Sequence, residues 1–198
     1  MVVTDKGEET RHRILEVASA HFAERGYAGT SLNDLIKETG LTKGGFYFHF
    51  DSKATLALEV VDYQRATWQA AVLEAASHHH DAVGQLRAMI HALIDLKRTH
   101  PGGAAIGKLC GELTFEPGMA NQIDHFAGWF EITERLFRRA QAEGDMDPAI
   151  DPVSAAHYAV GAFIGAESLS DLRGDGDLGR TIDEHISFTF RAVGITAR

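Results

Sequence analysis

Side chains that can donate a hydrogen bond to a phosphate oxygen gather in one short stretch, residues 43–53. They are Lys43, Tyr47, His49 and Lys53. Ser52 places Lys53 near the start of an expected helix, where backbone N–H groups also favour anions. Taken singly, the two lysines fit ordinary solvated charges and the tyrosine fits a core residue. The residue types alone therefore leave phosphate binding and a plain helical surface both open.

Two adjacent glycines, Gly44 and Gly45, interrupt this stretch. Each glycine inside a helix costs about 1 kcal/mol relative to alanine, so a helix that keeps two of them needs a reason. The missing side chains would let a helix backbone come close to DNA. The alternative interpretation is that the pair only ends a loop.

Three short helices joined by glycine-containing turns are predicted to position these residues. The first covers about residues 8–25 and ends at Gly26, the second covers about 31–39, and the third covers about 42–47. This order predicts a helix-turn-helix unit with one supporting helix, in which the third helix is the recognition helix.

Capping residues mark the starts of these helices. Ser31 and Asp34 fit a capping box, and Thr42 fits the N-cap of the recognition helix. Residues 48–50 are expected to turn the chain, after which Ser52 caps a fourth helix.

The remaining pattern is also helical. The fourth helix is expected to run to about Ser77, with an inner stripe of Leu56, Val60, Tyr63, Thr67 and Ala70. A later helix is expected over about 119–143, and Asp151 followed by Pro152 predicts the start of another. We find no strand pattern, so the predicted fold class is all-α with about nine helices.

The charge distribution bears on nucleic-acid binding. The net charge of −9 over 198 residues argues at first against it. However, residues 1–60 hold seven basic and nine acidic residues, whereas residues 61–198 hold 12 and 19. Within residues 41–53 the two lysines outweigh Asp51. The sequence therefore predicts a small, local basic surface.

Several classes of protein are not supported by the sequence. Cys110 is the single cysteine, which excludes an intrachain disulfide framework and a CxxC site. No apolar run reaches the roughly 18 residues of a membrane span, and no signal peptide is visible. We expect a cytoplasmic protein with no membrane contact, no cofactor and no metal. No catalytic motif is present, so we expect no enzyme activity.

Residues 30–53 closely resemble the DNA-binding segment of TetR-family transcriptional repressors, and residues 18–27 also fit that family. The resemblance implies a helix-turn-helix DNA-binding domain at 1–51 and an effector-binding and dimerisation domain at 52–198. The implied partners are double-stranded operator DNA, a small apolar effector and a second copy of the chain, joined through the last two long helices.

The resemblance also implies roles for individual residues. Lys43, Gly45 and Phe46 would lie towards the bases. Phosphates would be held by Thr42, Tyr47, His49 and Lys53, and on the other strand by Thr30 or Ser31. The full expected DNA-binding set is Thr30, Ser31, Thr42, Lys43, Gly44, Gly45, Phe46, Tyr47, His49 and Lys53.

Residues 47–50 combined with 129–132, Gly144-Asp145 and residues 151–157 resemble the γ-butyrolactone autoregulator receptors within the same family. In that branch a tryptophan lines the ligand cavity, and Trp129 matches it. Aromatic residues at helical spacing are more often core, so we expect about half of the aromatic candidates to be core residues. The expected effector-binding residues are Trp68, Cys110, Phe115, Met119, Phe126, Trp129, Phe130, His157 and Phe163.

Some features keep a plainer interpretation beside the functional one. Residues 78–80 are three histidines, which favour a solvated loop over a metal site because successive helical side chains point about 100° apart. Cys110 fits a small buried residue better than a redox sensor. His157 and Glu167 fit ligand binding or a satisfied core or interface position equally.

The leading hypothesis is a ligand-responsive repressor that binds a pseudo-palindromic operator as a dimer and is released by a small apolar effector. The alternative is an all-helical small-molecule carrier or enzyme with a vestigial DNA-binding head. A third possibility is a DNA-binding activator or architectural protein without an effector. Gly161 and Gly165 permit close helix approach, either at a dimer interface or within one chain.

Overall fold

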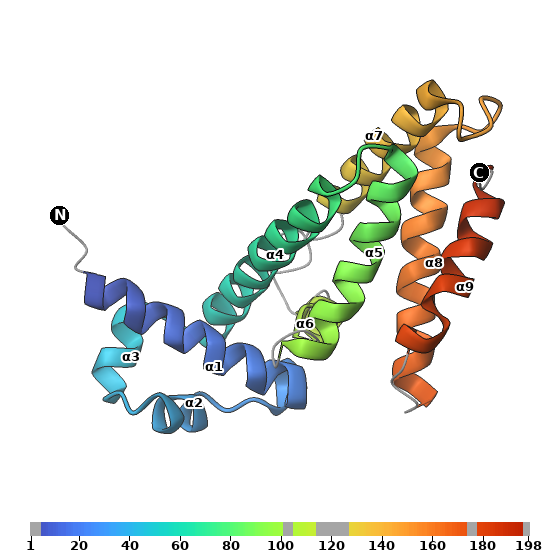
Figure 1. The fold of residues 1–198 in the computed structure, drawn as a ribbon. Coiled ribbons are helices and arrows are strands. Elements are labelled where there is room, and N and C mark those ends of the chain that lie inside the picture. Colours follow the sequence, from blue (N-terminus) through green and yellow to red (C-terminus); the bar gives the residue numbers. More distant parts are fainter. Residues whose placement is uncertain (1–4, 101–104, 114–126, 174–177, 196–198) are drawn as a thin grey trace. The chain divides into compact units, whose positions relative to one another are not determined.

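The computed structural model describes residues 5–100, 105–113, 127–173 and 178–195. These residues form nine α-helices and no strand, which confirms the predicted fold class (Figure 1). The helices are α1 (Asp5–Gly29), α2 (Leu32–Thr39), α3 (Lys43–His49), α4 (Lys53–Ser77), α5 (Ala82–Thr99), α6 (Ala105–Leu113), α7 (Ala127–Glu143), α8 (Pro152–Arg173) and α9 (Leu178–Ala192). The helix expected over 119–143 is described from Ala127 onward, and its expected start at residues 119–126 lies outside the described residues.

The helices group into two compact units. Unit 1 comprises Met1–Trp68 and Leu96–His125, and unit 2 comprises Gln69–Asp95 and Phe126–Arg198. Each unit therefore combines two separate stretches of the chain, and both α4 and α5 contribute to both units. The expected division of DNA binding and effector binding at residues 51 and 52 concerns function and stays a prediction.

Unit 1 has a hydrophobic core to which α1, α2, α3, α4 and α6 all contribute. Within this unit α1 packs against α2 and α6. Burying one phenylalanine or leucine side chain contributes about 1.5–3 kcal/mol, so these contacts fix the positions of α2 and α3. The largest fully buried members are Phe22, Leu35, Phe46, Phe50, Leu56, Leu109 and Leu113.

The break in α1 lies at Gly26, where the sequence predicts the helix to end. Gly26 has φ 71° and ψ −179°, a conformation that favours glycine, and the chain then makes one more helical turn to Gly29. A Cβ at this position would also collide with the Glu112 carboxylate of α6. The predicted end of the regular helix at Gly26 is confirmed, whereas the helical turn that follows it was not predicted.

The predicted caps are confirmed in three places. The Thr42 hydroxyl accepts a hydrogen bond from the Gly45 N–H at 3.1 Å, and the Ser52 hydroxyl accepts one from the Thr55 N–H at 3.0 Å. Asp151 accepts one from the Ser154 N–H at 3.0 Å where α8 begins. The Asp151 carboxyl has a lowered pKa because the hydroxyl and N–H of Ser154 both donate to it.

Two local predictions about α2 and α3 are wrong. Ser31 occupies the N-cap position of α2, but its side chain makes no capping hydrogen bond. Asp34 lies 3.9 Å from Arg25 of α1, so a tertiary ion pair replaces the predicted capping box. In addition, α3 continues to His49, so Phe48 is helical and does not turn the chain.

The inner stripe of α4 follows the prediction at its start and departs from it later. Leu56 and Val60 are fully buried, but Ala70 is exposed. Gln64 is buried instead, with 5% of its surface exposed. The buried face continues from Val60 in steps of four residues, which brings Gln64 and Trp68 onto it.

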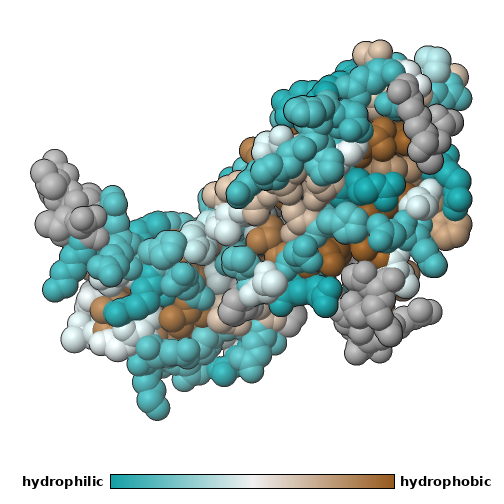
Figure 2. All heavy atoms as spheres, in the orientation of Figure 1, coloured by the Kyte–Doolittle hydropathy of each residue, from teal (hydrophilic) through white to brown (hydrophobic). Residues whose placement is uncertain are grey.

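Unit 2 has its own hydrophobic core, and within it α8 packs against α7 and α9. Figure 2 shows brown apolar atoms between the hydrophilic side chains of the visible face. None of the described helices is both long and apolar enough to cross a membrane. Several apolar side chains of α8 and α9 stay exposed, namely Val153, Tyr158, Leu169, Leu172 and Phe188.

Candidate DNA-binding site

The helix-turn-helix consists of α2, the turn at Gly40-Leu41, and α3. Gly40 adopts the left-handed conformation with φ 69° and ψ 15°, and its N–H donates to the Lys37 carbonyl at 3.3 Å. The Thr42 hydroxyl then accepts from the Gly45 N–H and fixes the first turn of α3. These bonds set the direction in which α3 leaves the turn.

One face of α3 is buried and the other is exposed. Phe46 and Phe50, four residues apart, lie in the core with 0% and 1% exposure. Of the other side chains of this helix, Lys43 is exposed at its start, and Tyr47 and Phe48 keep 38% and 85% of their surface accessible. The exposed side chains therefore comprise an ammonium, a phenol and a large apolar ring.

The glycine pair belongs to the first turn of α3, which excludes the interpretation that it ends a loop. A Cβ on Gly45 would lie 3.2 Å from the Thr42 hydroxyl oxygen, so a side chain would crowd the N-cap. A Cβ on Gly44 would meet no atom within 4 Å. The absence of a side chain at Gly45 is thus explained by the N-cap. At Gly44 the absence of a side chain leaves the exposed helix backbone uncovered.

Phe46 does not have the expected role. The resemblance places it towards the bases, but its side chain is fully buried, with its ring centroid 6.3 Å from that of Phe50. Phe48 is the most exposed aromatic residue of this helix, and sequence reasoning missed it because α3 was expected to end before it. If the expected helix had been continued by two residues to His49, the helical period of 3.6 residues would have placed Phe48 on the side away from Phe46.

Lys53 and Thr30 are engaged inside the protein. The Lys53 ammonium donates to the Tyr27 carbonyl at 2.8 Å and to the Thr30 carbonyl at 3.1 Å. It also lies 4.3 Å from the centroid of the Tyr27 ring. Thr30 is buried, and its hydroxyl donates to the Gly26 carbonyl at 2.7 Å. In the chain without DNA both residues position the junction between α1 and α2, and Ser31 is the half-buried hydroxyl beside them, so the phosphate contacts of these residues stay predictions.

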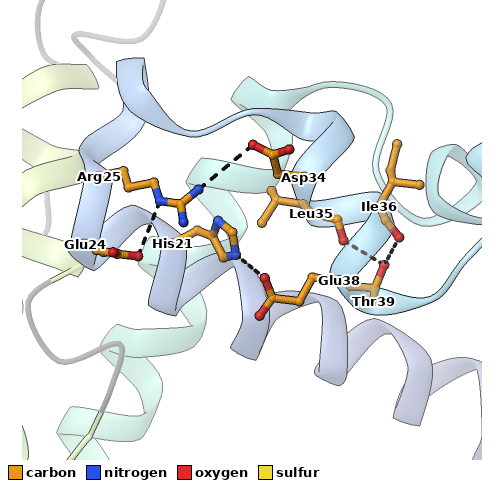
Figure 3. A network of polar contacts seen from close by, with 8 residues as sticks. All are labelled: His21, Glu24, Arg25, Asp34, Leu35, Ile36, Glu38 and Thr39. Carbon is orange, nitrogen blue, oxygen red and sulfur yellow. Dashed lines mark hydrogen bonds and ion pairs between the residues drawn. The ribbon is translucent and has the colours of Figure 1, made fainter.

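A polar network holds α2 against α1 (Figure 3). The buried His21 lies with its Nε2 2.6 Å from a carboxylate oxygen of Glu38. Arg25 approaches Asp34, and the Arg13 guanidinium donates to the Thr39 carbonyl at 3.0 Å. The contacts of His21 with Glu38 and of Arg13 with Thr39 join residues 17 and 26 positions apart, so spacing along the chain did not reveal them.

A carboxylate from α6 completes the junction. Glu112 accepts a hydrogen bond from the Ala28 N–H at 2.8 Å. Because the helix is interrupted at Gly26, this N–H has lost its place in the α1 ladder. Lys53 and Glu112 therefore hold the same short segment, one through its carbonyls and the other through an N–H.

Known proteins share this arrangement. The family model described as bacterial regulatory proteins, tetR family, matches residues 14–60, which include all of α2 and α3. A solved structure described as the molecular basis for control of antibiotic production by bacterial hormones superposes with a TM-score of 0.83 at 32% identity, covering 94% of this chain and 98% of the other. The chain belongs to the TetR family.

Two further comparisons extend well beyond residues 14–60. The A-factor receptor protein of Streptomyces griseus is 27% identical over 163 residues, which are 82% of this chain and 55% of that protein. The structure of TylP, a TetR regulator from Streptomyces fradiae, has a TM-score of 0.73 at 29% identity and covers 96% and 89% of the two chains. The chain thus spans about half the length of the curated relative. None of these descriptions names an enzyme.

The residues expected to bind the effector of this TetR-family protein fall into both units. Cys110 is buried in unit 1, where burial raises the pKa of its thiol to about 12, so it stays protonated and unreactive at neutral pH. In unit 2 Trp129 and Phe163 are half-buried against the core. Phe115, Met119 and Phe126 lie outside the described residues.

His157 is exposed and does not point into the core. Its ring stacks on Phe130 with centroids 4.6 Å apart, and its Nδ1 lies 2.9 Å from the Val153 carbonyl oxygen. The three histidines at 78–80 lie in an exposed loop, as predicted. His78 and His79 line a shallow groove of about 440 Å³ in unit 2, and no expected effector residue lines it.

Proposed function

We propose that this TetR-family protein is a transcriptional repressor that binds a pseudo-palindromic operator as a homodimer and leaves it when a small apolar effector binds. The observation that carries the proposal is the two-sided character of α3. Its inner face is fixed in the core through Phe46 and Phe50, whereas its outer face presents Lys43, Tyr47 and Phe48 to solvent. A helix held in this way can enter the major groove without rearrangement.

The exposed residues of this region contact different parts of the DNA. Tyr47 and the Thr42 hydroxyl, which keeps its own proton to donate, bind phosphates and set the register. The resemblance places Lys43 towards the bases, but we assign its exposed ammonium to a phosphate as well, because it is a charged donor at the start of α3. Bare backbone at Gly44 permits close approach to the groove floor. Phe48 supplies an apolar surface of the kind that contacts thymine methyl groups.

The proposed dimer forms through α8 and α9. Tyr158, Leu169 and Leu172 of α8 are 54%, 61% and 84% exposed, and Phe188 of α9 is 66% exposed. A Cβ at Gly161 or Gly165 would meet no atom of the chain within 4 Å, which leaves room for a second helix. Two such protomers would place recognition helices about 34–36 Å apart on the operator.

The proposed effector binds in the C-terminal part of the chain. The half-buried Trp129 matches the tryptophan of the γ-butyrolactone receptors, and the relative from Streptomyces griseus is named a receptor for A-factor. The effector is therefore a small, mostly apolar molecule of the γ-butyrolactone kind, and the protein acts in the cytoplasm, where its operator lies.

A mobility shift with the DNA upstream of its own gene tests the proposal. We expect retardation at low salt that survives an excess of unrelated competitor DNA. Absence of retardation at low salt would reject the repressor function. Trp129→Ala should keep operator binding and lose the response to the effector, and normal release of DNA by that variant would reject the assigned pocket.

A further inference from the structure

The end of α2 is held by a side chain that comes from another helix. The final carbonyls of an α-helix have no hydrogen-bond partner inside that helix. In α2 the Arg13 guanidinium of α1 donates to the Thr39 carbonyl at 3.0 Å. The Thr39 side chain is buried, and its hydroxyl donates back to the carbonyls of Leu35 and Ile36 (Figure 3). The contact from Arg13 therefore reaches the point at which the chain leaves α2.

Arg13 is well placed to fix this point. It directly precedes Ile14 and Leu15 in α1, and both of these residues are buried in the core of unit 1. The core thus holds the backbone of Arg13, whereas its side chain is exposed and extends to α2. A polar contact of an exposed side chain contributes little to the free energy of unfolding, because water competes for both partners. This contact therefore fixes a direction more than it stabilises the fold.

The start of α3 depends on that direction. Two residues separate Thr39 from Thr42, the N-cap of α3. Thr42, Lys43 and Gly44 are all exposed, and the first core residue of the helix is Phe46. The start of α3 therefore takes its position from the turn before it. Because this end of α3 carries groups proposed to meet phosphates and the groove floor, a small rotation of the turn moves all of them.

We propose that Arg13 is a positioning residue of the DNA-binding site. It acts through the Thr39 carbonyl, not through a phosphate contact of its own, and thereby allows the site to distinguish the operator from other DNA. The inference rests on the proposed function, because it specifies a contact inside the protein that operator recognition needs. Base contacts require an exact helix position, whereas attraction to the phosphate backbone is independent of sequence. Loss of Arg13 should therefore weaken operator binding more than binding to unrelated DNA.

The test compares two arginines of α1 that both reach α2. Arg13→Met keeps an aliphatic side chain and removes the donor at the end of α2. Arg25→Met is the matched control, because it removes the same charge from the same helix, but Arg25 approaches Asp34 in the first turn of α2, at 3.9 Å. Fluorescence anisotropy measures the affinity of each variant for the operator fragment and for a shuffled duplex of the same length and composition.

Arg13→Met should bind the operator about tenfold more weakly than Arg25→Met does, which is the effect of disturbing one base contact. The two variants should bind the shuffled duplex alike. They should also share one slope of log affinity against log salt, because neither loses a phosphate contact. Equal specificity in the two variants, or a slope lower by about one per protomer in Arg13→Met, would overturn the proposal.

Hydrogen exchange followed by mass spectrometry tests the same contact without DNA. In Arg13→Met the peptide over residues 38–47 should exchange about tenfold faster than in the wild type, while Tm falls by no more than about 4 °C. In Arg25→Met this peptide should be unchanged. Unchanged exchange in Arg13→Met, or a larger fall in Tm with faster exchange throughout unit 1, would overturn the positioning role.

The wild type separates this inference from the proposed function. If the wild-type protein fails to retard the operator fragment, the repressor function is wrong. The exchange of residues 38–47 then decides whether Arg13 holds the start of α3. If the wild type retards the fragment and Arg13→Met keeps full specificity, the repressor function stands and the role of Arg13 is wrong.

Discussion

The two units of the chain differ in the contacts that hold their helices and in the side chains that they leave exposed. In unit 1 the short helices are joined by side chains that reach backbone groups of their neighbours, as Lys53, Glu112 and Arg13 do. Unit 2 has similar ties near Gln141, but leaves large apolar side chains of α8 and α9 in solvent. We therefore expect the exposed side chains of α3 in unit 1, Phe48 among them, to meet DNA, and those of α8 and α9 in unit 2 to be covered by a second copy of the chain.

The largest effect should come from the core of unit 1. Phe46→Ala removes a fully buried ring, and we expect the free energy of unfolding to fall by about 3–5 kcal/mol. Urea unfolding followed by circular dichroism measures this change. Phe48→Ala is the matched control on the same helix, because its ring is 85% exposed and its loss should change stability by less than about 0.5 kcal/mol.

Operator affinity should give the complementary result for these two variants. Phe48→Ala should weaken operator binding while the fold stays intact. If Phe46→Ala were as stable as the wild type and bound operator poorly, Phe46 would face the bases after all, and the division of α3 into a buried and a DNA-facing side would be wrong.

The next largest effect concerns the exposed apolar faces of unit 2. Leu169→Glu places a carboxylate on the proposed dimer surface of each protomer, and we expect the dimer dissociation constant to rise at least about 100-fold. Sedimentation equilibrium measures it. Leu73→Glu is the control, since Leu73 is 52% exposed on α4, a helix that is not part of the proposed surface. An unchanged dimer in Leu169→Glu would remove α8 from the interface.

The contrast between the units also shows what the sequence could predict. Caps at Thr42, Ser52 and Asp151 were predicted correctly because each depends on residues within three positions. The nine helices of the described residues and the family also followed from patterns along the chain. The failed capping box at Ser31 has a tertiary cause, since Arg25 of α1 approaches Asp34.

Burial and pairing within the site could not be predicted in this way. Phe46 and Phe48 are both phenylalanines two residues apart, and only the end of α3 and its packing decide which one is buried. The two lysines of the motif also look equivalent in sequence. Lys43 is exposed, whereas Lys53 is bound to carbonyls 23 and 26 residues away, which no local pattern encodes.

This difference between the lysines gives an intermediate effect. Lys53→Ala should lower the free energy of unfolding by about 1–3 kcal/mol, because two carbonyls lose a charged donor. Lys43→Ala should leave stability unchanged but reduce the slope of log affinity against log salt by about one per protomer. Salt titrations of operator binding measure the slope. If Lys53→Ala reduced the slope of log affinity against log salt and left stability unchanged, Lys53 would act mainly as a phosphate contact.

The last two effects come from single titrating groups and should appear at the two ends of the pH range, one for each unit. In unit 1 burial raises the pKa of Cys110 to about 12, so the folded state keeps a proton that the unfolded state loses above about pH 9. The free energy of unfolding should therefore fall as pH rises from 9 to 12, by at most about 1.4 kcal/mol per pH unit from this group. Cys110→Ala should remove this part of the slope.

In unit 2 burial lowers the pKa of His185, so the unfolded state binds a proton that the folded state does not. Stability from this group is present above its ordinary pKa of 6.5 and is lost as pH falls through that value. The loss should be shallower than that of Cys110, because His185 is only half-buried. Urea unfolding between pH 5 and 7, compared with His185→Gln, measures it, and a variant that is as sensitive to acid as the wild type would assign the loss to another group.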